Sequence, residues 1–167
     1  MADITKESMF IGTTTPAGVI GTISRNVVGN VIEAVQVDDT AKIGYPVELD
    51  GTTGKAKLVT GTATAGSVYG FLVRKYSARL NQKDQSIEPV YTQAVLRNGF
   101  ILVQLAEEET TPIVKGMPVW VVIKTSGKYK TIGTVAAKDD SSSAIQINAT
   151  FMGPVDKNGV AEIAYNI

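Results

Sequence analysis

The residues that could carry chemistry in this 167-residue chain are mainly carboxylates and lysines, because the chain has no cysteine and no histidine. Without a thiolate or an imidazole, the usual nucleophile–base pairs are excluded, as is the commonest metal ligand. The segments "GTTGK" at 51–55 and "TSGK" at 125–128 contain the glycine–lysine pair of a phosphate-binding loop. A Walker A loop also requires an earlier glycine, where this chain has Leu49 or Val122, and a Ser or Thr directly after the lysine. Neither segment meets these requirements, so a phosphate-binding loop is excluded.

The carboxylates occur in short runs, Asp38-Asp39, Glu107-Glu108-Glu109 and Asp139-Asp140. Such runs are typical of exposed loops. A cation site would require several carboxylate oxygens to converge, and Asp38, Asp39 and Asp50 are its candidates, although their spacing does not predict convergence. A glycosidase would require a pair of opposed carboxylates, which the loop positions do not favour. We therefore predict no catalytic residue, no metal site and no cofactor.

Four aromatic residues of the predicted strands, Tyr69, Phe71, Trp120 and Tyr129, have two interpretations. They either belong to the core or line a face that binds sugars or bases. Because they alternate with other residues within strands, the core interpretation is favoured.

Composition indicates a globular protein of about one domain, with 44% hydrophobic and 19% charged residues. Sixteen basic residues balance 16 acidic ones, so the basic excess typical of nucleic-acid-binding proteins is absent. The N-terminal segment lacks the pattern of a secretory signal, and no apolar window is long enough to span a membrane. We expect a soluble protein made in the cytoplasm, without a nucleic-acid or membrane partner.

The elements that would position these residues are short strands rich in Val, Ile, Thr and Tyr, separated by Gly and Pro. Period-two alternation is clear in "AIQINATFM" at 144–152, and a helical period is not sustained anywhere. Asn98-Gly99 and "DKNG" at 156–159 predict tight hairpin turns. The fold class is therefore all-β, a jelly-roll-like sandwich or barrel of about 8–11 short strands. The expected strands are 18–24, 31–37, 45–50, 55–60, 68–75, 89–96, 99–106, 117–123, 128–134, 144–152 and 159–166.

One sequence segment occurs twice in similar form, as "KIGYPVELDGTTGKAKLVTGTA" at 42–63 and "VKGMPVWVVIKTSGKYKTIGTVA" at 114–136. Each copy predicts a β-hairpin in which a glycine turns the chain, a proline opens a strand and a second glycine closes the loop. The repeat indicates either an ancient duplication or two solutions to one structural problem. We interpret its turn residues as scaffold: Gly44, Pro46, Gly54, Gly116, Pro118 and Gly127.

The N-terminal residues differ in composition from the rest of the chain, since "GTTTPAG" at 12–18 cannot form a regular element. We predict an extended arm over residues 1–17 and a single β domain over residues 18–167. Met9, Phe10 and Ile11 form an apolar cluster on this arm. They either pack on their own domain or reach a neighbouring subunit.

Four segments together carry a family resemblance: "GYPVELDGTTGKAKLVT", "VYGFLVRKY", "AVLRNGFILVQL" and "KGMPVWVVIKTSGKYKTIGT". They resemble the structural cement proteins, or capsid decoration proteins, of tailed bacteriophages, over about residues 42–135. The resemblance implies a jelly-roll-like or barrel-like domain on the outer surface of the virion capsid, made in the host bacterial cytoplasm. It also implies a homo-dimer or homo-trimer that bridges phage major capsid protein subunits, and it transfers no catalytic residue.

Under this interpretation the interface residues are Met9, Phe10 and Ile11 of the arm and Glu107, Glu108 and Glu109. Loops 50–54, 107–112 and 136–144 would form the presented surface. The alternative function is a non-enzymatic carbohydrate- or ligand-binding β module of a virion fibre or tail. A carboxylate enzyme is the least favoured reading.

Overall fold

The computed structural model describes residues 18–74 and 92–167, which form an all-β structure with one short 3-10 turn at Ala65–Ser67. The sequence-based prediction of the fold class is confirmed. The strands are β1 (Val31–Gln36), β2 (Pro46–Leu49), β3 (Ala56–Leu58), β4 (Gly70–Leu72), β5 (Thr92–Gln104), β6 (Pro118–Val122), β7 (Val135–Ala136), β8 (Ala144–Phe151) and β9 (Val160–Tyr165).

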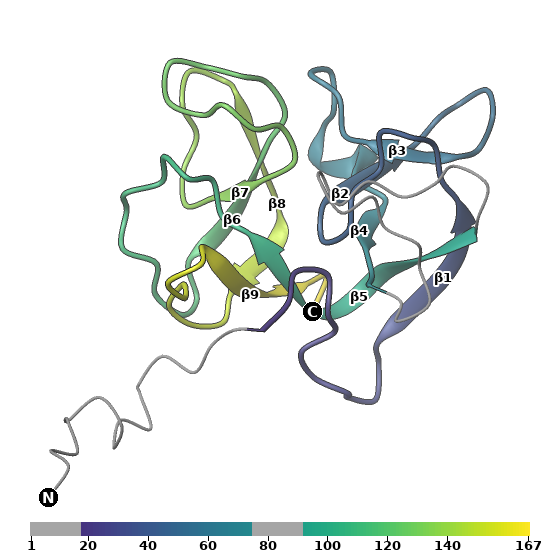
Figure 1. Cartoon of the computed structure of the whole chain (residues 1–167), viewed down its shortest axis with the longest axis horizontal. Helices are drawn as coiled ribbons and strands as arrows, with labels where there is room; N and C mark the ends of the chain where they lie inside the picture. Colours follow the sequence, from purple (N-terminus) through teal and green to yellow (C-terminus); the bar gives the residue numbers. More distant parts are fainter. Residues whose placement is uncertain (1–17, 75–91) are drawn as a thin grey trace, which may run out of the picture.

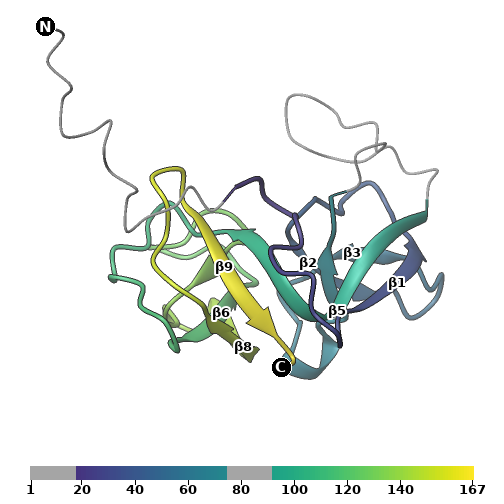
Figure 2. The same cartoon turned by 90° about the horizontal axis from the view of Figure 1, so that it is seen from below.

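The strands form one curled sheet in which every paired strand is antiparallel to its neighbour. Its path is β3-β2-β4-β5-β9-β8-β6-β7, and β1 pairs with β5 beside this path. Figure 1 shows two lobes, one formed by β1 to β4 and one by β6 to β9, with β5 extending between them. Figure 2 shows β5 and β9 side by side where the lobes meet.

The hairpin predicted at Asn98-Gly99 is wrong, because the long strand β5 includes both residues. Its first part pairs with β1 and β4, and its second part pairs with β9, so the chain continues straight across the predicted turn. Gly99 has a φ of 139°, and a Cβ there would lie 2.4 Å from Oδ1 of Asn30. Asn98 Nδ2 donates to the carbonyl of Asn166 at 2.6 Å, and Asn166 Nδ2 donates to the carbonyl of Arg97 at 2.8 Å. The Asn-Gly pair therefore lies where β5 passes from one half of the sheet to the other, and pairing with β9 keeps the chain extended there.

The two halves of the sheet have the same topology. In chain order, β1, β2, β3, β4 and the first part of β5 correspond to the second part of β5, β6, β7, β8 and β9. In each half the first strand pairs with the last, and the other strands continue outward in the same order. The strand β5 belongs to both halves, as the last strand of one and the first strand of the other.

The register also agrees between the halves. The parallel bridge from Val37 to Ala56 recurs as a bridge from Leu105 to Val135. Equivalent antiparallel pairs are Leu49–Ala56 and Val121–Val135, Phe71–Leu96 and Thr150–Ala164, and Ala34–Ala94 and Leu102–Glu162. Because strand pairings match throughout the two halves, the structural repeat extends well beyond the similar segments at 42–63 and 114–136. This agreement favours a duplication over two independent solutions.

The repeated turn residues occupy equivalent places in the two halves. Gly44 and Gly116 precede β2 and β6 and have φ values of 75° and 89°, which favour glycine. Pro46 and Pro118 are the first residues of these strands, where a missing N–H is tolerated. A Cβ at Gly44 would lie 2.1 Å from Ile20 Cγ2, whereas a Cβ at Gly116 would meet nothing within 4 Å.

The closing glycines of the two copies differ. Gly54 has a φ of 68° and ends the short loop between β2 and β3. Gly127 does not have a positive φ and lies within a longer loop, residues 123–134, between β6 and β7. Ser126 and Asp140 organise that loop through a 2.6 Å hydrogen bond from Ser126 Oγ.

Two expected strands, 18–24 and 128–134, are not regular strands. Residues 128–134 belong to the loop before β7, in which Gly133 has a φ of 85°. The other segment lies along β5: Gly21 N–H donates to the Leu102 carbonyl at 2.7 Å, and Leu102 N–H donates to the Thr22 carbonyl at 3.0 Å. This segment therefore pairs with a strand edge through its backbone without regular strand geometry.

The main hydrophobic core is shared by both halves. It includes Phe71 of the first half together with Ile101 and Phe151 of the second, all fully buried. Phe71 contacts Tyr165 edge-to-face with ring centroids 5.2 Å apart, and the Tyr165 hydroxyl donates to the carbonyl of Val68 at 3.0 Å. The halves therefore pack on one another as well as sharing a strand.

Candidate functional site

The acidic loop, residues 107–112, lies within the connection between β5 and β6 and contains the three predicted interface glutamates. Glu109 points inward, and its side chain is fully buried. Its carboxylate lies 2.9 Å from Lys128 Nζ and accepts a hydrogen bond of 2.9 Å from the Tyr129 hydroxyl. It also accepts from the backbone N–H groups of Thr111 and Ala137, both at 3.0 Å. These contacts join the acidic loop to the β6–β7 loop and to the residue after β7.

Opposing effects act on the ionisation of this buried group. Burial raises the pKa of Glu109, but the hydrogen bonds from Lys128, Thr111 and Ala137 outweigh it and lower that pKa to about 2. Burial likewise opposes the charged form of Lys128, and its hydrogen bonds to Glu109 and Tyr129 raise its pKa overall. Both groups are therefore ionised at neutral pH and satisfy each other inside the protein. Glu109 therefore fixes the acidic loop against the β6–β7 loop.

The other two glutamates of the acidic loop are more accessible. Glu107 is exposed and Glu108 is half-buried. The structure thus separates the predicted glutamate set into one internal residue and two residues at the surface. Met9, Phe10 and Ile11 lie outside the described residues.

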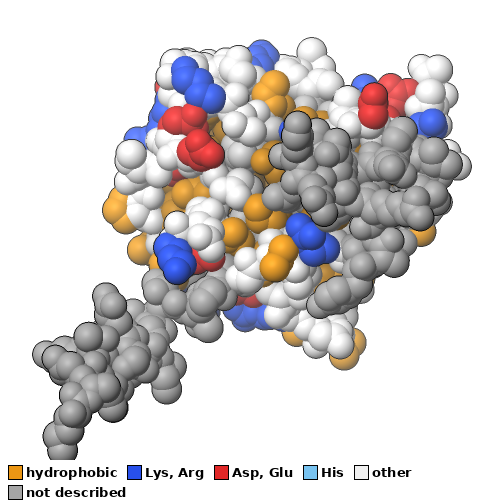
Figure 3. All heavy atoms as spheres, in the orientation of Figure 1, with side chains coloured by type: hydrophobic (Ala, Val, Ile, Leu, Met, Phe, Trp, Pro, Cys, Tyr) orange, Lys and Arg blue, Asp and Glu red, His pale blue; other side chains and the backbone are white. Residues whose placement is uncertain are grey.

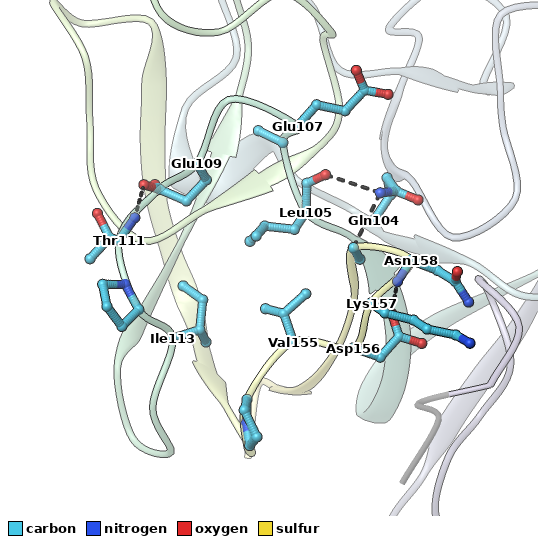
Figure 4. A pocket seen from close by; sticks show the side chains of 14 residues that line it. Gln104, Leu105, Glu107, Glu109, Thr111, Ile113, Val155, Asp156, Lys157 and Asn158 are labelled. Atoms are coloured by element: carbon cyan, nitrogen blue, oxygen red, sulfur yellow. Dashed lines mark hydrogen bonds between the residues drawn. The ribbon is translucent and has the colours of Figure 1, made fainter. Parts of the chain in front are cut away.

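A cleft of about 640 Å³ lies beside the acidic loop, opposite the turn between β8 and β9. Figure 4 shows side chains from both segments around it, with Ile113 and Val155 forming an apolar floor. Asp156 holds the turn, since its Oδ1 accepts from the N–H groups of Asn158 and Val160 at 2.8 and 2.9 Å. This is the hairpin turn that the "DKNG" motif predicts.

The cleft combines apolar and charged lining residues. Asp156 Oδ2 is buried and has no hydrogen-bond partner among the described residues. Glu107 and Lys157 contribute opposite charges to the lining. Such a mixed, open cleft suits the side chains of a protein loop, and it contains no nucleophile–base pair within the part of the chain that the structure describes.

Two of the three carboxylates considered for a cation site, Asp38 and Asp50, each stabilise their own turn. Asp38 Oδ1 accepts from the N–H and hydroxyl of Thr40 at 2.9 and 2.7 Å. Asp50 Oδ1 accepts from the N–H of Thr53 at 2.8 Å, and its Oδ2 lies 3.2 Å from Lys57 Nζ. In residues 18–74 and 92–167, no group of three or more acidic side chains is placed to hold a metal ion. These residues also contain no helix long and apolar enough to cross a membrane.

The four aromatic residues lie in the hydrophobic core clusters or pack against them. Phe71 and Tyr129 are fully buried, and Trp120 is half-buried against Tyr129 and its neighbours. Tyr69 is half-buried against a second core cluster that includes Leu72. Its hydroxyl donates to Glu33, and the Arg97 guanidinium stacks 3.7 Å from its ring centroid. No aromatic face for sugars or bases forms from these four residues.

Several residues of the site carry no clear sequence signal. Lys128 occurs in the "SGK" segment, whose local pattern suggests only a turn, and its partner Glu109 is 19 residues away. The position of Asp156 in "DKNG" does predict a turn, but the facing acidic loop becomes its neighbour only through the β5–β9 pairing.

Comparison with known proteins gives one family match and a structural likeness. The family model of structural cement proteins (E217 gp24/Pam3 gp6) matches residues 10–166, nearly the whole chain. Among solved structures, a chain from "The capsid of Myoviridae Phage XM1" is similar, with a TM-score of 0.67 and 18% sequence identity. That match covers 94% of this chain and 95% of the other, and it shows a common fold. A comparison with curated protein sequences gives no match.

Proposed function

The chain belongs to the structural cement protein family of phages, and we propose that it binds the outer surface of a phage head and stabilises it by bridging major capsid protein subunits. The family match over residues 10–166 is the observation that carries this proposal. It covers residues 10–17 of the predicted arm and residues 18–166 of the predicted β domain, so we propose that residues 1–17 and 18–167 act together. We further propose that the protein is a homo-dimer or homo-trimer located on the virion.

The described surface supports a role based on contact rather than catalysis. Charged side chains of both signs are interspersed with apolar ones on the face in Figure 3, and the chain has no net charge. A protein that occupies many equivalent lattice positions can bind weakly at each contact and still stabilise the lattice, because the contacts are linked. We therefore propose a non-enzymatic role without a cofactor.

The cleft and the acidic loop are the proposed capsid contact within the β domain. Glu107 and Glu108 are accessible there, and the buried Glu109–Lys128 pair keeps the loop in one conformation. A fixed loop loses less conformational entropy on binding than a free one. Met9, Phe10 and Ile11 would add an apolar contact from the arm.

The test adds purified protein to phage heads that lack it and measures co-sedimentation and the melting temperature of the heads. We expect saturable binding and a higher melting temperature. Glu107→Lys combined with Glu108→Lys should weaken binding. Asp39→Lys is the matched control. The strand register makes Asp39 of the first half the equivalent of Glu107 in the second half.

Two results would contradict the proposal. One is the absence of co-sedimentation at saturating concentration. The other is equal weakening by the acidic-loop variant and the Asp39 variant, which would indicate a general charge effect. Saturable binding to glycans by a protein that ignores heads would instead support the ligand-binding alternative.

A further inference from the structure

We propose that the outer edge of β1 pairs with β1 of a second copy of this chain, antiparallel and about a two-fold axis at Ala34. The inference rests on the homo-oligomer of the proposed function and names the surface that forms it. The two sheets would become continuous through β1 of each copy.

The internal repeat identifies this edge as incomplete. In the second half, the outer edge of β5 is covered by residues 21–24, through backbone hydrogen bonds that involve Gly21, Thr22 and Ser24. The equivalent edge in the first half is that of β1. Within residues 18–74 and 92–167, no segment pairs with it. One half thus has an added strand segment where the other half has an open edge.

The repeat also shows which backbone groups of β1 point outward. Leu102 directs both its N–H and its C=O toward residues 21–22. Ala34 is the register equivalent of Leu102, because Ala34 pairs with Ala94 as Leu102 pairs with Glu162. Ala34 therefore directs its N–H and C=O away from β5. By alternation, Ile32 and Gln36 do the same.

The side chains around this edge are exposed and apolar. Val31 and Ile32 are 47% and 48% exposed, and Val28, in the turn before β1, is fully exposed. In the second half, by contrast, Leu102 is buried, and a Cβ on Gly18 would lie 3.0 Å from its Cδ1. The covered edge is buried where the open one presents aliphatic side chains to water.

The edge has one irregularity, between Val31 and Ile32, but it lacks the side chains that most often prevent pairing. Its sequence, VIEAVQ, contains no lysine, arginine or proline, the residues that natural edge strands use to block association. Its one charge, Glu33, is engaged within its own copy by Tyr69 and by Arg97 Nη1 at 3.2 Å.

A second copy fits this edge because the strand is self-complementary about Ala34. In this register Ala34 faces Ala34, and Ile32 faces Gln36 of the other copy. Each opposed pair can exchange two hydrogen bonds, giving about six in total. Glu33 faces Val35, so the two glutamates are not directly opposed, an arrangement that avoids like-charge repulsion. A small residue on the axis leaves room for the aliphatic side chains on either side.

The test measures the mass of the full-length protein by sedimentation over a range of concentrations, without phage heads. We expect a concentration-dependent dimer for the native chain and at least a tenfold weaker dimer for Ala34→Lys. Val114→Lys is the matched control, since Val114 is 58% exposed in the loop before β6, away from the β1 edge. Circular dichroism should show the same β content for all three proteins.

Cysteine cross-linking tests the register directly, because the chain has no cysteine of its own. Ala34→Cys should form a disulfide-linked dimer, since directly opposed residues with Cα atoms about 5.5 Å apart can be bridged. Ile32→Cys and Gln36→Cys should not cross-link alone but should do so when mixed.

A native monomer, an Ala34→Lys dimer as strong as the native one, or cross-linking of Gln36→Cys alone would each overturn the inference. A monomer that still binds heads would contradict the proposed homo-oligomer but leave the proposed binding and stabilisation of heads standing. If Ala34→Lys lowered that binding, the edge would instead accept a strand of the capsid protein. A β1 dimer that ignores heads would have the opposite meaning, supporting this contact and contradicting the proposed function.

Discussion

Replacing Glu109 by glutamine should lower the free energy of unfolding by about 2–3 kcal/mol at neutral pH, because it removes the charge that pairs with Lys128. The magnitude follows from the ionisation of Glu109. Its pKa falls from the ordinary 4.5 to about 2 in the folded protein, which at 1.36 kcal/mol per pH unit is roughly 3 kcal/mol. Lys128 can partly reach solvent, since its side chain is 23% exposed, so the loss should be at the lower end of that range.

The effect of Glu109→Gln on stability should also depend on pH. The carboxylate of Glu109 has a lower pKa in the folded state than in the unfolded state, so its contribution is complete above pH 4.5 and is lost as the pH falls toward 2. The difference in stability between the native chain and Glu109→Gln should therefore be constant from pH 7 to 5 and shrink below pH 4.5. Other acidic residues titrate in both proteins and cancel in this difference.

Urea denaturation at several pH values measures this difference. Glu107→Gln is the matched control, because Glu107 lies two residues away on the same loop but is exposed. We expect a change of less than about 0.5 kcal/mol for this control. The reasoning would be refuted if both variants lost equal stability, or if the Glu109→Gln difference stayed constant down to pH 2.5.

Three further predictions concern the arm, the turns and the segment along β5. Deleting residues 1–17 should weaken attachment to heads while the circular dichroism spectrum stays β-rich; a collapsed spectrum would contradict an arm outside the domain. Gly44→Ala should lower the free energy of unfolding by more than about 3 kcal/mol, and Gly116→Ala by about 1 kcal/mol. Of these two glycines, only Gly44 combines its positive φ with a close neighbour, and equal losses in urea denaturation would contradict this. Arg25 follows the segment along β5, and its Nη2 lies 2.7 Å from Oε2 of Glu162 in β9. Because this ion pair is partly exposed, Arg25→Ala should cost about 1 kcal/mol or less. It should also speed hydrogen exchange at the Leu102 amide, and unchanged exchange would show that Arg25 does not hold this segment.

The sequence predicts the fold class and many strands because their signals are local. Period-two alternation in residues 144–152 corresponds to β8, and the proline of each G-x-P-V segment begins a strand. The turn chemistry of "DKNG" is likewise satisfied within a few residues, through Asp156. Where partners are close in sequence, pattern and structure agree.

The errors arise where distant partners decide the conformation. Asn98-Gly99 has the composition of a hairpin turn, but its neighbours Asn30 and Asn166 are 68 residues away on either side. Glu109 looks like a surface charge in a run of three, and becomes internal because Lys128 and Ala137 reach it from another loop. Neither contact has a signature in the local sequence.

The single strand β5 has a consequence for how the domain responds to tension. Because it is the last strand of one half and the first strand of the other, a force that pulls the halves apart along its axis is carried by peptide bonds. The ladders on either side of it would have to slide in shear, with many hydrogen bonds loaded together. Two halves joined by a flexible linker would first separate at their packed side chains, because a slack linker carries little force until it is extended.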